Sequence, residues 1–134
     1  MITTAGKILP EIVDEIFGKL VKQGGVCETS GICMYGREND HCALGWLLPP
    51  DNADLMVADG GVHDLLTDYR GELGPNETFI LTNRSLMVCL QNFHDADGKH
   101  TLDESYGELP PFAKELPNTN AWYTLRTKQL ESDQ

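Results

Sequence analysis

Near its N-terminus the chain carries apolar residues at the spacing of one buried helix face, and this pattern constrains the fold most: Leu9, Ile12, Val13, Ile16, Phe17, Leu20 and Val21. Pro10 stands at a favourable first helical position, and Gly24-Gly25 supplies a stop. Acidic side chains gather near the start of the segment and lysines near its end, as the helix dipole favours. We therefore predict an amphipathic helix whose apolar face belongs to the core.

Two later segments carry the same helical spacing. The first follows Asn83, a predicted N-cap, and its apolar face is formed by Leu86, Cys89, Leu90 and Phe93. The second follows the predicted cap Asn118-Thr119 and carries Trp122, Leu125 and Leu130. A loop that contains Pro110, Pro111 and Pro117 is predicted before this last helix. The stretch 51–82 is broken by glycines, and one short helix is predicted in it, around Val62, Leu65 and Leu66.

Residues 31–48 predict a small β-hairpin. Residues 32–35 form its first strand, residues 36–40 its turn and residues 41–44 its returning strand. In a tight register Cys33 faces Cys42, with the β-carbons about 4.5–5.5 Å apart. We therefore predict an α+β fold, a helix-rich single domain over residues 1–134 with one small β-hairpin.

The net charge narrows the classes of partner. The chain has 134 residues, enough for one domain, with 10 basic and 21 acidic residues for a net charge of −11. Nucleic-acid-binding proteins usually present a basic face, and anionic membranes attract basic ones. No apolar run approaches the ~20 residues of a membrane span. We expect no direct nucleic-acid or membrane contact and, without a signal peptide, a cytoplasmic location with reduced thiols.

The acidic charge is concentrated in the middle of the chain. Residues 38–77 contain nine acidic residues and one basic residue, Arg70, and residues 95–108 add five acids against Lys99. We predict an acidic binding surface that attracts a basic protein partner, formed by Asp51, Asp54, Asp59, Asp64, Asp68 and Glu72. The alternative is that these acids serve solubility alone.

Cys33 and Cys42 have three alternative interpretations. Together with His94 they are candidate zinc ligands, although their spacing differs from the short Cys-x2–4-Cys turns of most zinc sites. They are also a candidate redox disulfide, or two small hydrophobic side chains of the core. Core packing is the reading we expect, so we expect no cofactor and keep zinc as the alternative.

Gln91, His94 and Asp95 share one face of a predicted helix, because they lie three and four positions apart. A His-Asp pair also occurs in HD-type metal phosphohydrolases, but the further ligands of those enzymes are not recognisable here. Residues 93–104 partly match a calcium-binding loop, yet Phe93 stands at the first ligand position. A cysteine nucleophile paired with His94 needs a nearby cation or helix N-terminus, which the acidic surroundings oppose.

Three motifs resemble those of a known family. The chain contains Cys33-Met34-Tyr35, Cys42-Ala43-Leu44-Gly45-Trp46-Leu47-Leu48-Pro49 and Leu90-Gln91-Asn92-Phe93-His94-Asp95. They resemble an uncharacterised family of small bacteriophage and bacterial proteins with Cys-x-Tyr, Cys-Ala-x-Gly-x-Leu-x-Pro and Leu-Gln-x-x-His-Asp motifs. The resemblance covers a core of about residues 8–97, and residues 98–134 have no counterpart in it. It implies phage origin, a shared fold and one cluster of Cys33, Cys42, Gln91, His94 and Asp95.

These observations favour a small acidic phage accessory protein. We expect it to bind and inhibit a host protein, either a defence protein or a nucleic-acid-binding protein, in the host cytoplasm. One alternative is a metal-binding protein or Cys/His enzyme centred on Cys33, Cys42, His94 and Asp95. Another is a protein that sequesters a nucleotide, in which Arg37, Arg70 or Arg84 would offset the acidic charge.

Overall fold

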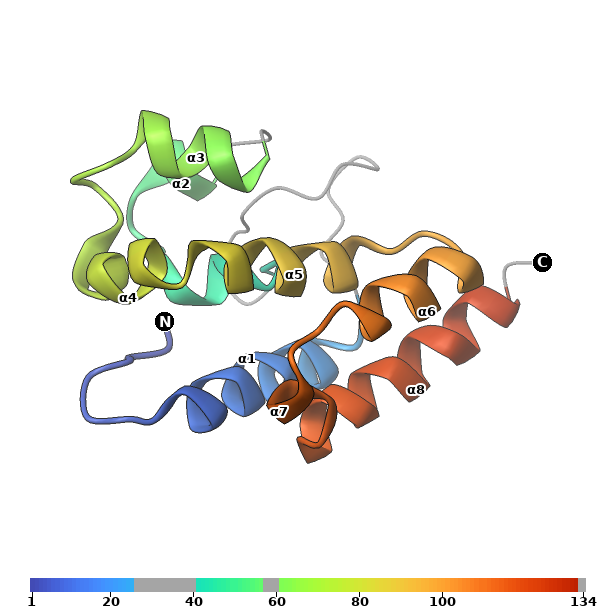
Figure 1. Ribbon diagram of the computed structural model, residues 1–134. Coiled ribbons are helices and arrows are strands. Elements are labelled where there is room, and N and C mark those ends of the chain that lie inside the picture. Colours follow the sequence, from blue (N-terminus) through green and yellow to red (C-terminus); the bar gives the residue numbers. More distant parts are fainter. Residues whose placement is uncertain (26–40, 57–60, 133–134) are drawn as a thin grey trace.

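The computed structural model describes residues 1–25, 41–56 and 61–132, and within these ranges the protein is helical (Figure 1). The helices are α1 (Leu9–Gln23), η1 (Leu44–Leu47), α2 (Ala53–Met56), α3 (Val62–Asp68), η2 (Gly74–Asn76), α4 (Glu77–Thr82), α5 (Arg84–Asp95), α6 (Lys99–Gly107), α7 (Pro111–Lys114) and α8 (Pro117–Ser132). The two η elements are 3₁₀-helices.

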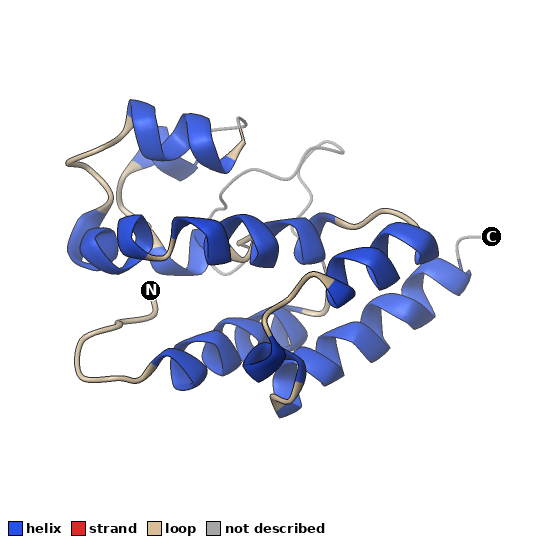
Figure 2. Ribbon diagram, in the orientation of Figure 1, coloured by secondary structure: helices blue, strands red, loops and turns tan. Residues whose placement is uncertain are grey.

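The predicted α+β class is wrong, because the described part of the chain contains no strand (Figure 2). The predicted returning strand, residues 41–44, instead runs into the 3₁₀-helix η1. The first strand, with the pairing of Cys33 and Cys42, lies outside the described residues. A short apolar run does not distinguish a buried strand from another buried segment, and here it is the latter.

Helix α1 confirms the prediction from apolar spacing. Its buried residues are Ile12, Val13, Ile16, Phe17 and Leu20. Gly24 ends the helix in the left-handed conformation (φ 90°), and its N–H donates to the carbonyl groups of Leu20 and Val21.

Helices α1 and α8 lie side by side, although almost the whole chain separates them (Figure 1). The Asp14 carboxylate accepts the backbone N–H of Asn118 at 3.0 Å, and the Gln129 side chain donates to the Gly24 carbonyl at 2.8 Å. These two contacts lie near the start and the end of the pair, so the helices run parallel. The predicted cap Asn118-Thr119 is wrong, because the cap of α8 comes from α1.

Helix α5 packs across this pair through Phe93, whose ring meets the edge of Phe17 at a centroid distance of 5.6 Å. Asn83 stands at its N-cap position, but the Asn83 side chain donates to the Phe79 carbonyl of α4 and does not cap the start of α5. Helix α3 packs on α5 and buries Val62, Leu65 and Leu66, the residues that predicted it.

The predicted proline-containing loop before the last helix is wrong, because α6 and α7 lie between α5 and α8. Helix α6 packs antiparallel against α8, and Tyr106 of α6 contacts Tyr123 of α8 at a ring-centroid distance of 4.4 Å. Glu104, which would close a calcium loop, lies inside α6. Because α5 extends to Asp95 and α6 begins at Lys99, only residues 96–98 lie between the helices, too few for the twelve-residue ligand loop of such a site.

Candidate functional site

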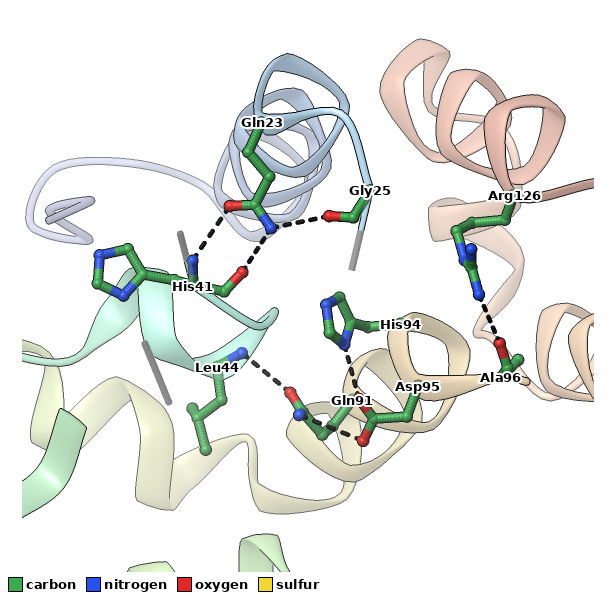
Figure 3. A network of polar contacts seen from close by, with 9 residues as sticks. All are labelled: Gln23, Gly25, His41, Leu44, Gln91, His94, Asp95, Ala96 and Arg126. Carbon is green, nitrogen blue, oxygen red and sulfur yellow. Dashed lines mark hydrogen bonds and ion pairs between the residues drawn. The ribbon is translucent and has the colours of Figure 1, made fainter. Parts of the chain in front are cut away.

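The segment 41–48 is buried along its whole length, and one turn of it is the 3₁₀-helix η1. Buried backbone groups outside helices and sheets need other hydrogen-bond partners. Gln23, at the end of α1, supplies several of them (Figure 3). Its amide group donates to the carbonyls of His41 (2.7 Å) and Gly25 (2.9 Å), and its oxygen accepts from the His41 N–H and the Trp46 indole.

Asn76 and Gln91 hold the same segment from two other directions. The buried Asn76 side chain donates to the carbonyls of Leu47 (2.9 Å) and Ile2 (2.6 Å). The Gln91 side-chain oxygen accepts the Leu44 N–H at 3.2 Å (Figure 3). Three carboxamide side chains thus perform the pairing that the predicted hairpin would have performed with a second strand.

Gln91 also begins a chain of contacts along α5 (Figure 3). Its amide nitrogen donates to Asp95 Oδ2 at 3.4 Å, and Asp95 Oδ1 lies 2.7 Å from Nδ1 of His94. The Cys42 thiol hydrogen-bonds to the same Gln91 side chain. The structure therefore brings Cys42, Gln91, His94 and Asp95 into one network, whereas Cys33 lies outside the described residues.

Burial raises the pKa of the Cys42 thiol to about 12. Hydrogen bonds from Gly45 and Gln91 lower this pKa, and the charge of Asp95 raises it, but burial dominates. The thiol is therefore protonated at neutral pH. A thiolate nucleophile, which a Cys/His enzyme requires, is not available in this arrangement.

His94 is fully buried at the end of α5, while its partner Asp95 is about half exposed (48%). The Trp122 ring of α8 stacks on the His94 ring at a centroid distance of 5.6 Å, with only 6° between the two planes. Nε2 of His94 is buried and has no hydrogen-bond partner among the described residues. Most buried polar atoms in proteins are paired, so this atom is unusual.

The predicted acidic surface maps to α2, α3 and the turns beside them. Its described members are all exposed: Asp51, Asp54, Asp64, Asp68 and Glu72. Asp59 lies outside the described residues. Figure 1 shows α2 and α3 on the side of α5 opposite α1 and α8. Arg70, also exposed, is the one basic residue of this region in the described part of the chain.

An acidic hollow lies between the end of α5 and α6. It has a volume of about 330 Å³, and its lining includes Asp95, Asp97, Glu104 and Glu108. The excess of acids over residues 95–108 was the sequence signal for it. The sequence did not lead us to predict roles for Gln23 and Asn76. The only sign of them in the sequence is that each is an amide side chain at the end of a helix, Gln23 of α1 and Asn76 of η2.

No described helix has the length and apolarity needed to cross a membrane. Within residues 1–25, 41–56 and 61–132, no group of three or more His, Cys, Asp and Glu side chains is arranged to hold a metal ion. Comparison of the chain with protein-family models, with curated proteins and with solved structures finds no match.

Proposed function

We propose that this chain is a small acidic accessory protein that binds a basic surface of a partner protein through α2, α3 and the turn at Glu72. The observation that supports this proposal is the group of five exposed carboxylates on α2, α3 and their flanking turns. These two helices lie on the side of α5 opposite α1 and α8 (Figure 1). Single surface ion pairs stabilise little, but a field of one sign speeds encounter with an oppositely charged partner. Such binding needs no cofactor.

The resemblance to small phage proteins leads us to propose a host protein as the partner, in the host cytoplasm. A nucleic-acid-binding or defence protein fits best, because its basic groove normally receives phosphate groups. Carboxylates at the same groove compete with the phosphates, and the acidic protein then acts as an inhibitor.

The two alternative functions have weaker support. Protonation of the buried Cys42 thiol disfavours a Cys/His enzyme. The hollow beside α2 is lined by Pro49, Asp51, Asn52 and Asp54, and the hollow at α6 is also acidic. Carboxylates repel the phosphates of a nucleotide, so neither hollow suits a nucleotide-sequestering protein.

A matched pair of charge-reversal variants tests the proposed function. The first replaces Asp64, Asp68 and Glu72 with Lys, and the control replaces the exposed Glu11, Glu115 and Glu131 with Lys, so both change the net charge equally. Bound host proteins are captured at low and high salt, identified, purified and rebound with and without competing DNA.

We expect to capture a basic nucleic-acid-binding protein. High salt, competing DNA and the first variant should each abolish its binding, whereas the control variant should still bind it. Two results contradict the proposal. One is recovery of no basic partner. The other is binding that neither salt nor the first variant weakens.

A further inference from the structure

We propose that the Asp97-Gly98 peptide bond is a site of spontaneous isoaspartate formation, and that Thr101 holds this reaction back in the folded protein. The pair lies in the linker between α5 and α6, which consists of residues 96–98. The inference concerns the backbone of this linker and does not rest on the function proposed for α2 and α3.

An aspartate that is followed by glycine can react with its own backbone. The Gly98 nitrogen attacks Cγ of Asp97, a C–N bond forms and a C–OH bond of the carboxyl group breaks. The hydroxyl leaves with the proton of the nitrogen as one water molecule, and the product is a succinimide ring. Water then opens the ring at Cγ, which restores aspartate, or at the former backbone carbonyl, which gives isoaspartate. The reacting atoms belong to adjacent residues, so covalent geometry alone keeps them within reach, and nothing is oxidised or reduced.

The surroundings of the linker permit this attack. Asp97 is exposed and lines the acidic hollow of about 330 Å³ beside α6, so water reaches its carboxyl group. Gly98 has no side chain to shield its nitrogen. Because Gly98 is the N-cap residue of α6, its N–H has no partner within that helix's own ladder of backbone hydrogen bonds.

Thr101, in the first turn of α6, restrains the attacking group. Its hydroxyl oxygen accepts the Gly98 N–H at 3.1 Å, and it lies 2.9 Å from the Gly98 carbonyl oxygen and 3.5 Å from Oδ1 of Asp97. The Gly98 carbonyl also accepts the Leu102 N–H at 2.9 Å. Ring closure requires the peptide group between Asp97 and Gly98 to turn and its nitrogen to give up the hydrogen. The hydrogen bonds to Thr101 must break first, so the reaction proceeds from a state in which the start of α6 has opened.

Isoaspartate changes how α5 is joined to the rest of the molecule. It adds one methylene carbon to the backbone of a three-residue linker, and it moves Gly98 away from its capping position. The same linker contains Ala96, whose carbonyl accepts a hydrogen bond from the buried Arg126 of α8 at 2.9 Å. The isoaspartate form should therefore unfold at a lower temperature than the unmodified protein.

The test incubates the folded full chain near neutral pH in water labelled with heavy oxygen, and then digests it with trypsin in ordinary water. Ring opening places one heavy oxygen atom at residue 97, and fragmentation of the tryptic peptide 85–99 locates it. Thr101→Val keeps the shape of the side chain but removes its hydrogen bonds. Loss of one helix cap raises the opened fraction about 2–30-fold, so the label should enter faster by this factor. Thr101→Ser keeps the hydroxyl and should behave like the wild type.

Two controls accompany this comparison. Asp59-Gly60, the other Asp-Gly pair of the sequence, falls in the tryptic peptide 38–70 and is the internal reference, whose rate Thr101→Val should leave unchanged. Gly98→Ala tests the chemistry itself. Its methyl group fits, because the nearest heavy atom, Oγ1 of Thr101, lies 3.7 Å away, but the methyl group shields the attacking nitrogen, so most of the label at residue 97 should be lost.

Hydrogen exchange of the Gly98 N–H, measured by NMR, reports the opening directly and should rise in Thr101→Val by the same factor as the labelling rate. If Thr101→Val unfolds, the wild type decides alone: at low urea concentrations its labelling rate must rise in proportion to this exchange rate. Absence of label at residue 97, an unchanged ratio of the rates at residues 97 and 59 in folded Thr101→Val, wild-type labelling in Gly98→Ala, or labelling that does not follow the exchange rate overturns the proposal.

Discussion

At the scale of single residues, carboxamide side chains supply hydrogen bonds to the buried backbone of this fold. Each of three carboxamides hydrogen-bonds buried backbone of residues 41–48: Gln23 as donor and acceptor at His41, Asn76 as donor to Leu47, and Gln91 as acceptor from Leu44. A carboxylate at these positions would lack the donor, and an apolar side chain would leave backbone groups unpaired. The hydrogen-bond partners of these three residues therefore favour a carboxamide, and for Gln91 those partners include the Asp95 carboxylate.

Gln91→Ala should lower the free energy of unfolding by about 1–3 kcal/mol, because the buried Leu44 N–H loses its acceptor. Urea unfolding measures this loss, and Asn92→Ala, at the exposed neighbouring position, should stay within about 0.5 kcal/mol of the wild type. Equal losses in the two variants would contradict the role given to Gln91.

Cys42 should make the stability of the protein sensitive to alkali. The unfolded thiol loses its proton near its ordinary pKa of 9.0, whereas burial holds the folded pKa at about 12. The unfolded state then binds fewer protons, so stability is fully present below pH 9 and falls above it by about 1.4 kcal/mol per pH unit. We expect the stability difference between wild type and Cys42→Ala, measured by urea unfolding, to shift by this slope above pH 9. A constant difference would show that Cys42 is not held protonated.

At the scale of elements, the capping of α8 by α1 ties together two helices that are distant in sequence. Asp14→Ala removes the acceptor for the Asn118 N–H and should cost about 0.5–2 kcal/mol. Asp14→Asn keeps an acceptor oxygen and should lose less. Thermal unfolding of both variants beside Glu11→Ala, an exposed change in the same helix, checks this. A loss in Glu11→Ala as large as that in Asp14→Ala would argue against capping.

The sequence predicts well those elements whose apolar residues recur at the three- and four-residue spacing of a helix. Helix α1, the residues of α5 that face Phe17, and Trp122 on α8 follow from helical spacing alone. The same spacing correctly puts Gln91 and Asp95 together, because they are four positions apart on one helix.

The elements that sequence misses depend on contacts between distant parts of the chain. Residues 41–48 have no period, and their conformation depends on amides that come from α1, η2 and α5. Helix α6 is largely polar, with only Leu102 and Ser105 buried, so its face carries almost no apolar signal.

At the scale of the whole molecule, α8 completes the core. Trp122 is fully buried, and α8 makes its most extensive contact with α1. A chain that ends at Asp97, which keeps the segment resembling the phage family, leaves the face of α1 that packs on α8 open to water. It should show no cooperative urea transition, whereas a chain that ends at Ser132 should unfold like the full protein. Cooperative unfolding of the shorter chain would show an independent domain.

The parallel pairing of α1 with α8 has a consequence for the order of folding. Helix α1 leaves the ribosome before its packing partner α8, and residues 24–116 lie between them. Until α8 is made, an apolar face of α1 stays exposed, as is typical of chains that chaperones hold. Once released, the chain must close a loop of nearly its own length before this contact forms, so we expect slow folding for a helical protein of this size.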